Sequence, residues 1–274
     1  MDSLLNGSVS DSIPIRDRGL AYGDGVFETM AARNGEPLLF TAHMERLQSG
    51  CRRLGIAAPD TKQCRDEIER LCSGRTGVVK LILTRGCGGR GYAPEGGLQP
   101  NRLLLFSEWR AFPESFYRDG VRIEICRLRI SEQPQLAGMK HLNRIENVLA
   151  AQELDGGPAE EGLMLDHNDY IIECTRSNIF FIKEGRLHTP DLGRCGVNGV
   201  MRNHILECAR RDGIQTLVRD IHLDEAEQME EAFVCNSLIG IWPVARLGNK
   251  ISFQIDMIPA IREWTREHTL GQGI

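Results

Sequence analysis

The amino-acid sequence predicts a protein of mixed α and β structure that is divided into two domains. At 274 residues the chain exceeds the usual size of one domain. Short runs rich in β-branched residues, such as Val78–Thr84, alternate along the chain with stripes of apolar residues at helical spacing. The tripeptide Ala111-Phe112-Pro113 interrupts this alternation and is typical of a linker. We therefore expect a small N-terminal α/β domain over residues 1–110 and a larger C-terminal domain over residues 111–274.

The composition is that of a soluble globular protein and argues against several classes of function. Apolar residues make up 41% of the chain and charged residues 26%. A net charge of −5 disfavours a broad nucleic-acid footprint. No apolar run approaches the roughly 18 residues of a membrane span, and the N-terminus lacks the pattern of a signal peptide. Nine scattered cysteines without a Cys-x-x-Cys pair indicate reduced thiols in a cytoplasmic protein, with neither a disulfide framework nor a metal site.

The first half of the chain predicts a sheet with helices. Residues 13–30 contain Gly19, Gly23 and Gly25 and favour a structured turn over a phosphate-binding loop, because neither nucleotide-binding glycine pattern is present. The expected strands are Val26–Ala32, Pro37–Phe40, Val78–Thr84 and Arg102–Glu108, with Asn34-Gly35 as a hairpin turn. The expected helices are one capped by Thr41, with Met44, Leu47, Cys51 and Leu54 on its apolar stripe, and one over Thr61–Cys72.

Two features of this half are candidates for binding an anion. Arg46 lies off the apolar stripe of its helix, where a solvated arginine is usual but a phosphate also suits the fixed fork of its donors. The stretch Arg85-Gly-Cys-Gly-Gly-Arg90-Gly-Tyr92 follows a strand and combines four glycines with two arginines. An anion-binding loop and a plain long hairpin both account for it.

The stretch Ala137-Gly-Met-Lys140-His-Leu-Asn-Arg144 is the centre of the second half. A helix is expected after it, because Leu142, Ile145, Val148 and Leu149 form one apolar stripe. Lys140 lies where this helix meets an irregular segment, between apolar residues. Desolvation lowers the pKa of an amine and supplies the neutral nucleophile that Schiff-base chemistry needs. A solvated lysine at a helix start is the alternative that position alone leaves open.

Three further features accompany this lysine. Glu173 stands between apolar residues on a predicted strand, so it lies either on a wet face or buried with a partner. The segment Gly193–Arg202 brings glycine-rich backbone to a helix start, which suits an anion but is also how many helices begin. A buried strand from Glu231 ends in Asn236 and Ser237, small polar residues of the kind that often face a ligand. A C-terminal helix over Ile258–His268 has no assignable role.

These residue types are together those that a pyridoxal 5′-phosphate site requires. A lysine bonds to the cofactor, a buried carboxylate keeps the pyridine nitrogen protonated, and helix-start N–H groups with an arginine hold the phosphate. Over almost its whole length, from Asp17-Arg18-Gly19 to Asn236, the sequence resembles the fold-type IV family of pyridoxal-phosphate enzymes. This family includes branched-chain aminotransferases, D-amino-acid aminotransferases and aminodeoxychorismate lyases. The resemblance implies a two-domain fold in which the larger, C-terminal domain is a pseudo-barrel.

Within the family the sequence is most similar to the lyases. The stretches that carry this similarity are Arg85–Tyr92, Lys140–Arg144, Gly196–Arg202 and Cys235-Asn236. Branched-chain aminotransferases have a tyrosine five residues after the lysine, where this chain has Ile145. They also have Gly-Ile-Thr-Arg where this chain has Gly199-Val200-Met201-Arg202. Both departures favour a lyase, although D-amino-acid aminotransferases also lack that tyrosine.

The resemblance implies a role for each site residue. Lys140 is implied as the Schiff-base lysine and Glu173 as the partner of the pyridine nitrogen. The implied phosphate ligands are Arg46, the backbone of Val200 and Met201, and the region of Asn236. For the two carboxylates of a lyase substrate, the expected partners are Arg90 and Tyr92 in the glycine-rich loop, and Arg144.

The reaction implied is the conversion of 4-amino-4-deoxychorismate to 4-aminobenzoate and pyruvate, with Lys140 as the base. An aminotransferase of the D-amino-acid or branched-chain type on the same fold is the first alternative. A non-catalytic binder of small molecules is the second. The family further implies a homodimer that acts on a small-molecule substrate.

Overall fold

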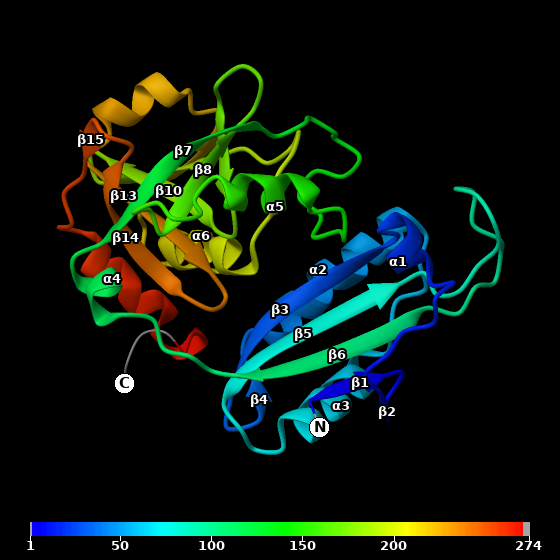
Figure 1. Cartoon of the computed structure of the whole chain (residues 1–274). Coiled ribbons are helices and arrows are strands. Elements are labelled where there is room, and N and C mark those ends of the chain that lie inside the picture. The colour runs from blue at the N-terminus through cyan, green and yellow to red at the C-terminus, as the bar shows by residue number, and fades with distance from the viewer. Residues whose placement is uncertain (1, 271–274) are drawn as a thin grey trace. The chain divides into compact units, whose positions relative to one another are not determined.

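The computed structural model describes residues 2–270 and divides the chain into two units (Figure 1). The first comprises Met1–Arg110 together with Met139–Asn143, and the second comprises Ala111–Gly138 and Arg144–Ile274. The sequence placed every residue after 110 in the second domain, and for residues 139–143 this is wrong. Their backbone pairs with a strand of the first unit, since the N–H of Phe27 donates to the carbonyl of Lys140 at 2.9 Å.

The first unit is built on an antiparallel sheet whose described strands run in the order β2-β1-β6-β5-β3-β4. Helices α2 and α3 cover one face of this sheet (Figure 1). The strands are β1 Ser3–Leu5, β2 Ser8–Val9, β3 Gly25–Arg33, β4 Glu36–Pro37, β5 Gly77–Thr84 and β6 Asn101–Glu108, and the helices are α1 Arg18–Tyr22, α2 Phe40–Leu54 and α3 Thr61–Cys72.

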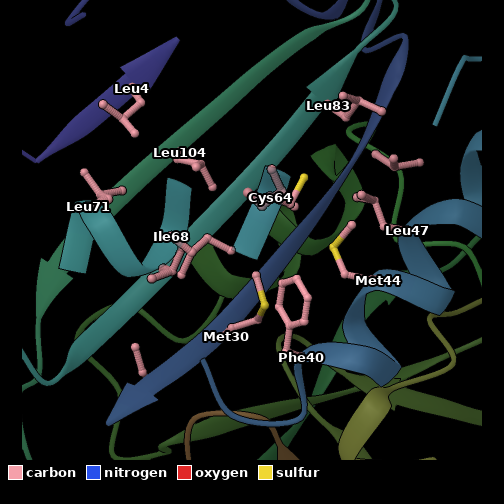
Figure 2. Close-up of a cluster of buried hydrophobic side chains, with 14 of the residues drawn as sticks. Leu4, Met30, Phe40, Met44, Leu47, Cys64, Ile68, Leu71, Leu83 and Leu104 are labelled. Carbon is pink, nitrogen blue, oxygen red and sulfur yellow. The ribbon is translucent and has the colours of Figure 1, made fainter. Parts of the chain in front are cut away.

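The core of the first unit lies between this sheet and its two long helices. Figure 2 shows Met30 of β3 and Leu104 of β6 facing Met44 and Leu47 of α2 and Ile68 of α3. The apolar stripe predicted for the α2 helix is therefore the buried one. Val26 and Met30 point into this core, so Phe27 and Thr29, which alternate with them, point to the opposite face of the sheet.

One predicted strand in the first unit is largely absent. Pro37–Phe40 was expected to be extended, but β4 ends at Pro37 and α2 already begins at Phe40. Leu39 adopts a left-handed conformation with φ of 50°, which turns the chain so that the Phe40 side chain enters the core. Thr41 consequently lies inside the helix and does not cap it.

The second unit holds a larger mixed sheet, with described strands in the order β12-β11-β10-β13-β14-β7-β8-β9 and β15 beside β14. Pairs β7·β8, β7·β14 and β11·β12 are parallel, and the others are antiparallel. Strand β9, at one end, connects to the interior strand β10 through a turn closed by the Cys174 N–H and the Ser177 carbonyl. The sheet thus curls back on itself, as the predicted pseudo-barrel requires.

The elements of the second unit follow one another closely along the chain. The strands are β7 Val121–Arg129, β8 Glu161–Leu165, β9 Ile171–Cys174, β10 Asn178–Lys183, β11 Arg186–Pro190, β12 Thr216–Arg219, β13 Glu231–Asn236, β14 Gly240–Leu247 and β15 Ile251–Ser252. The helices are α4 Glu114–Arg118, α5 Ile145–Gln152, α6 Val200–Arg211 and α7 Ile258–Arg262, with 3₁₀ turns at η1 Leu223–Gln228 and η2 Glu263–His268. The predicted C-terminal helix is therefore α7 continued by a 3₁₀ segment.

The apolar stripe expected on the helix after Lys140 is not buried. Helix α5 starts only at Ile145, and Ile145, Val148 and Leu149 are 65%, 48% and 47% exposed. Its buried residue is Ala150, which packs with Cys126 and Met164. Because Ala150 and its neighbours make that contact, the stripe faces outward and leaves an apolar surface on this unit.

The cysteines lead to a first prediction. All nine are free, and Cys87 alone among them is exposed. Burial raises the pKa of Cys51, Cys64 and Cys126 to about 11, so these thiols stay protonated near neutral pH. We expect Ellman's reagent to titrate one thiol in the native protein at pH 8 and nine after denaturation. Replacement of Cys87 by serine should abolish the native reaction; a second fast thiol would show that a buried site opens readily.

No helix among residues 2–270 is both long and apolar enough to cross a membrane.

Candidate active site

Lys140 lies on the first unit, in an extended segment beside β3. His141 forms an antiparallel bridge with Val26, and the N–H of Leu142 donates to the Gly25 carbonyl at 3.0 Å. This pairing places Lys140 opposite Phe27, so both side chains occupy the same face of the sheet. The Nζ of Lys140 is 4.5 Å from the centroid of the Phe27 ring. The candidate catalytic amine therefore lies on the sheet face opposite α2 and α3.

Gly25 makes this close approach of the chain feasible. A Cβ at this position would lie 2.3 Å from the carbonyl oxygen of Leu83 on β5 and 2.8 Å from the side chain of Leu142. A larger residue would push the 139–143 segment away from β3. The local sequence thus fixes the backbone on which Lys140 is carried.

Arg46, a predicted phosphate ligand, forms a buried ion pair in the first unit. Its Nε and Nη2 donate to the two carboxylate oxygens of Glu28, and the Nδ1 of His43 is 2.6 Å from Glu28 Oε2. Burial acts to raise the pKa of Glu28, but Arg46 and His43 outweigh it and lower the pKa to about 2. Glu28 therefore stays ionised and orients the guanidinium.

The surroundings of His43 connect this ion pair with the lysine. Burial lowers the pKa of His43, and the positive charges of Arg46 and Lys140 lower it further, although the nearby Glu28 opposes them. His43 is therefore neutral at physiological pH. The charge of Lys140 thus contributes to the electrostatic environment of His43, although its side chain occupies the opposite face of the sheet.

Glu173 lies on β9 of the second unit and is buried. Its Oε2 accepts a hydrogen bond of 2.8 Å from the backbone N–H of Val197. The segment of Val197 is itself held by Gly138, because the Gly138 N–H donates to the Gly196 carbonyl and the Asn198 N–H to the Gly138 carbonyl. Within this unit, the chain just before Lys140 and the chain just before α6 are therefore paired, with Glu173 attached to the second.

Val200 and Met201 open helix α6, with Gly199 as the preceding residue. Gly199, as the N-cap residue, has no side chain that could cap this helix start, and N–H groups in a first helical turn lack acceptors within the helix. A Cβ at Gly199 would lie 2.0 Å from Oδ1 of Asn178, so only glycine fits here. The predicted backbone ligands thus lie at a helix N-terminus that begins with a glycine, an arrangement that suits a phosphate.

Asn236, at the end of β13, uses its side chain within a turn. Its Oδ1 accepts from the N–H groups of Leu238 and Ile239 at 2.8 and 3.0 Å, and its Nδ2 donates to the carbonyl of Arg176. Asn236 therefore ties the β13–β14 hairpin to the turn between β9 and β10. The role of the Asn236 region at a phosphate stays a prediction. Because the Asn236 side chain is engaged within the turn, the backbone N–H groups of this turn are better candidates for phosphate donors than that side chain.

The expected substrate contacts are distributed over the two units. Arg144 immediately precedes α5 in the second unit; burial lowers its pKa, and the charges of Glu173 and Glu146 oppose that shift. Arg90 and Tyr92 lie in an exposed loop of the first unit, with Tyr92 86% exposed and its ring 5.5 Å from that of Tyr22. Arg144 is therefore close enough to Glu173 for the two charges to interact. Arg90 and Tyr92 lie together in the glycine-rich loop.

Sequence reasoning missed Lys80 on β5. Its Nζ is 5.1 Å from the centroid of the same Phe27 ring that Lys140 contacts. Lys80 pairs with Thr29 across the sheet and is exposed, so two ammonium groups flank one aromatic ring on the face that carries Lys140. The signal was present in the sequence, because Lys80 is a lone charge inside the apolar run Val78–Thr84. Only the strand register shows that this charge and Lys140 share a face.

The first unit carries an amine, that of Lys140, and the second carries a buried carboxylate, Glu173, and the start of α6, where the Asn178 contact leaves no room for a side chain at Gly199. These are the groups that a cofactor with a reactive aldehyde, a basic ring nitrogen and a phosphate requires. Together with the two sheets, they indicate the class of the pyridoxal-phosphate enzymes.

Comparison with known proteins makes this assignment specific. Residues 25–247 match the family described as amino-transferase class IV, and the chain belongs to this family. The enzymes of this family depend on pyridoxal phosphate, so the predicted cofactor is confirmed.

Individual relatives cover nearly the whole chain. An aminodeoxychorismate lyase from Vibrio harveyi is 35% identical over 92% of this chain and 94% of its own length. A putative branched-chain-amino-acid aminotransferase from Methanocaldococcus jannaschii is 28% identical over 92% of this chain and 89% of its own. The crystal structure of 4-amino-4-deoxychorismate lyase from Pseudomonas aeruginosa matches with a TM-score of 0.92 and 44% identity, covering 97% of this chain and 98% of that one. The predicted fold class and family resemblance are confirmed.

Proposed function

We propose that this protein is an aminodeoxychorismate lyase, which converts 4-amino-4-deoxychorismate to 4-aminobenzoate, a folate precursor, and pyruvate. The observation that carries the proposal is the match at 44% identity over 97% of the chain to a solved lyase of this specificity. The Vibrio harveyi relative supports the same activity. The absence of the tyrosine that branched-chain aminotransferases have five residues after the lysine, where Ile145 stands, agrees with it.

In this proposal Lys140 carries the proton transfers. Pyridoxal phosphate, when bound, withdraws electrons from the carbon that bears the substrate amine. The Lys140 amine removes the proton from that carbon and returns a proton to the departing enolpyruvyl oxygen. Glu173 holds a proton on the ring nitrogen, since a buried carboxylate favours a cationic partner. The elimination leaves an aromatic ring, which makes the reaction strongly favourable.

The phosphate ligands in this proposal are backbone N–H groups and one arginine. The N–H groups of Val200 and Met201 supply donors at the positive end of the α6 dipole. Arg46 supplies charge, and its guanidinium is oriented in advance by Glu28. The turn that Asn236 holds supplies further backbone donors.

The experiment that tests the function is turnover of 4-amino-4-deoxychorismate by the purified enzyme loaded with cofactor. We expect 4-aminobenzoate and pyruvate in equal amounts. The alternative is an aminotransferase that acts on D- or branched-chain amino acids; the Methanocaldococcus jannaschii relative supports the branched-chain type and a D-alanine aminotransferase of Listeria monocytogenes, 27% identical over 86% of this chain, the D-amino-acid type. Faster transfer of an amino group from D-alanine or leucine to a keto acid than production of 4-aminobenzoate would favour that alternative.

Lys80 is a proposed partner of a substrate carboxylate, in addition to Arg90, Tyr92 and Arg144. The Lys80 ammonium lies on the sheet face that also carries Lys140, and the Phe27 ring lies between the two amines. Lys80→Gln should raise the KM for 4-amino-4-deoxychorismate about 10- to 100-fold, because hydrogen bonds to charged groups contribute about 1.5–3 kcal/mol. The affinity for pyridoxal phosphate and kcat should change little.

The control for this prediction is Lys62→Gln on α3, whose side chain is exposed and paired with Asp66. This variant should retain the KM of the wild type. An unchanged KM in Lys80→Gln as well would show that Lys80 is an ordinary solvated lysine.

The enzyme is further proposed to act as a homodimer in the cytoplasm. The exposed apolar side chains of α5, Ile145, Val148 and Leu149, are a surface of the kind that association covers. Nine free thiols agree with a reducing compartment. Light scattering at micromolar concentration tests the dimer: a monomeric mass would contradict it.

A further inference from the structure

Arg18 in helix α1 of the first unit is buried, with 3% of its surface exposed, although it lies beside an exposed loop. Its Nη1 donates to the carbonyl of Gly91 at 3.0 Å and its Nη2 to the carbonyl of Tyr92 at 2.6 Å. The third donor, Nε, bonds Asp24 at 2.9 Å. One guanidinium thus connects a helix to two successive peptide carbonyls of the glycine-rich loop.

The guanidinium of Arg18 is itself held on several sides. Asp24 Oδ2 also accepts from Arg85 Nε at 2.7 Å, and the two other nitrogens of Arg85 bond the carbonyls of Leu54 and Gly55. Burial acts to raise the pKa of Asp24, but the hydrogen bonds from Arg85 and Arg18 outweigh it and leave the pKa lowered, so the carboxylate stays ionised. The Tyr22 ring lies 4.8 Å from the Arg18 guanidinium carbon. Arg18 is therefore a rigid anchor.

The loop has little else to fix its central part. Residues 89–97 are all exposed, and four of them are glycines. The Tyr92 ring contacts Tyr22 edge-on, which is an aromatic contact on the same helix as Arg18. A segment with exposed side chains and few buried contacts opens easily unless specific bonds hold it. The two hydrogen bonds from Arg18 hold the loop at Gly91 and Tyr92, within this exposed segment.

We propose that Arg18 is a positioning residue for substrate binding, which clamps the backbone at Gly91 and Tyr92 and thereby presents Arg90 and Tyr92 to a substrate carboxylate. The inference rests on the proposed function of this loop. An arginine is needed because its planar fork reaches two carbonyls while Nε keeps the Asp24 bond. Lysine, with one ammonium, cannot make this set of bonds in the same geometry.

The clamp is tested on the cofactor-loaded enzyme with Arg18→Lys and Arg18→Ala. Trypsin needs a locally unfolded backbone around its cleavage site, so release of the loop from Arg18 should speed cleavage after Arg90, and this readout is independent of activity. We expect the rate of cleavage after Arg90, identified by mass spectrometry, to rise about tenfold or more in both variants, as loss of two partly buried hydrogen bonds implies. Arg16→Ala, which removes an exposed arginine nearby, should leave it unchanged.

Kinetics separate positioning from a general structural role. The KM for 4-amino-4-deoxychorismate should rise about tenfold, while kcat changes less than about threefold, because the chemistry at Lys140 is untouched. Millimolar guanidinium added to Arg18→Ala should restore both protection from trypsin and KM. If Arg18→Ala does not fold, Arg18→Lys decides. Wild-type rates of cleavage after Arg90 with an unchanged KM would overturn the clamp.

The result remains distinguishable from failure of the proposed function. If the wild-type enzyme does not turn over 4-amino-4-deoxychorismate, the lyase proposal fails. In that case increased cleavage after Arg90, reversed by guanidinium, would still support the clamp as a property of the loop, and its absence would overturn it.

Discussion

Lys140→Ala is expected to lower kcat by at least about 10⁴-fold, because one amine is proposed to bind the cofactor covalently and to transfer both protons. The fold should be retained, since the contribution of this residue to the first unit is backbone pairing: the Phe27 N–H donates to the Lys140 carbonyl, which alanine preserves. The aromatic contact with Phe27 is lost, but this contact lies on the face away from the core. Turnover of 4-amino-4-deoxychorismate and the melting temperature measure the two effects separately.

Borohydride reduction of the loaded enzyme adds a direct readout. The wild-type protein should retain cofactor on the peptide that contains Lys140, and the variant should retain none. Lys62→Ala is the matched control, because it removes an exposed lysine whose ion pair with Asp66 lies along helix α3. Labelling of a different lysine in the wild-type enzyme would refute the assignment of Lys140.

The place of Lys140 in the fold illustrates what local sequence can and cannot predict. The stretch Ala137–Arg144 alone left a solvated lysine open, and Lys140 became the candidate only together with the other site residues and the family resemblance. Its neighbours were expected to start a helix, yet it lies in an extended segment that pairs with β3, more than one hundred positions earlier in the chain. This pairing requires that residue 25 has no side chain, because a Cβ there would contact the Leu142 side chain and the Leu83 carbonyl. The spacing of apolar residues in the sequence does not indicate such a requirement.

The same limit applies to charged partners. The apolar stripe of α2 was readable, and so was the position of Arg46 off that stripe. Glu28, the carboxylate that orients Arg46, could not be assigned, because its place between the core residues Val26 and Met30 does not show which cation pairs with it. In helix α5 the sequence does show the apolar stripe, but the structure leaves that stripe exposed. The spacing of apolar residues does not indicate whether a stripe is buried within its own chain or against a second molecule.

Glu173→Gln is expected to lower kcat about 10²- to 10⁴-fold, the range attributed to a single proton-transfer partner. A glutamine has the shape of the carboxylate but no charge, so it cannot favour a proton on the ring nitrogen. Its Oε1 can still accept the Val197 N–H, which now bonds Glu173 at 2.8 Å, so β9 and the segment before α6 should keep their arrangement. The melting temperature should therefore change far less than the rate.

Measuring cofactor affinity by absorbance titration distinguishes loss of chemistry from loss of cofactor. Glu173→Gln should bind pyridoxal phosphate within about tenfold of the wild type, because the proposed phosphate donors at Val200 and Met201 and the amine of Lys140 are unchanged. Glu184→Gln, at an exposed turn in the same unit, is the control and should keep wild-type kcat. A kcat within threefold of the wild type in Glu173→Gln would mean that this buried carboxylate serves only to hold Val197. The electron-withdrawing ring would then need another acid to keep its nitrogen protonated.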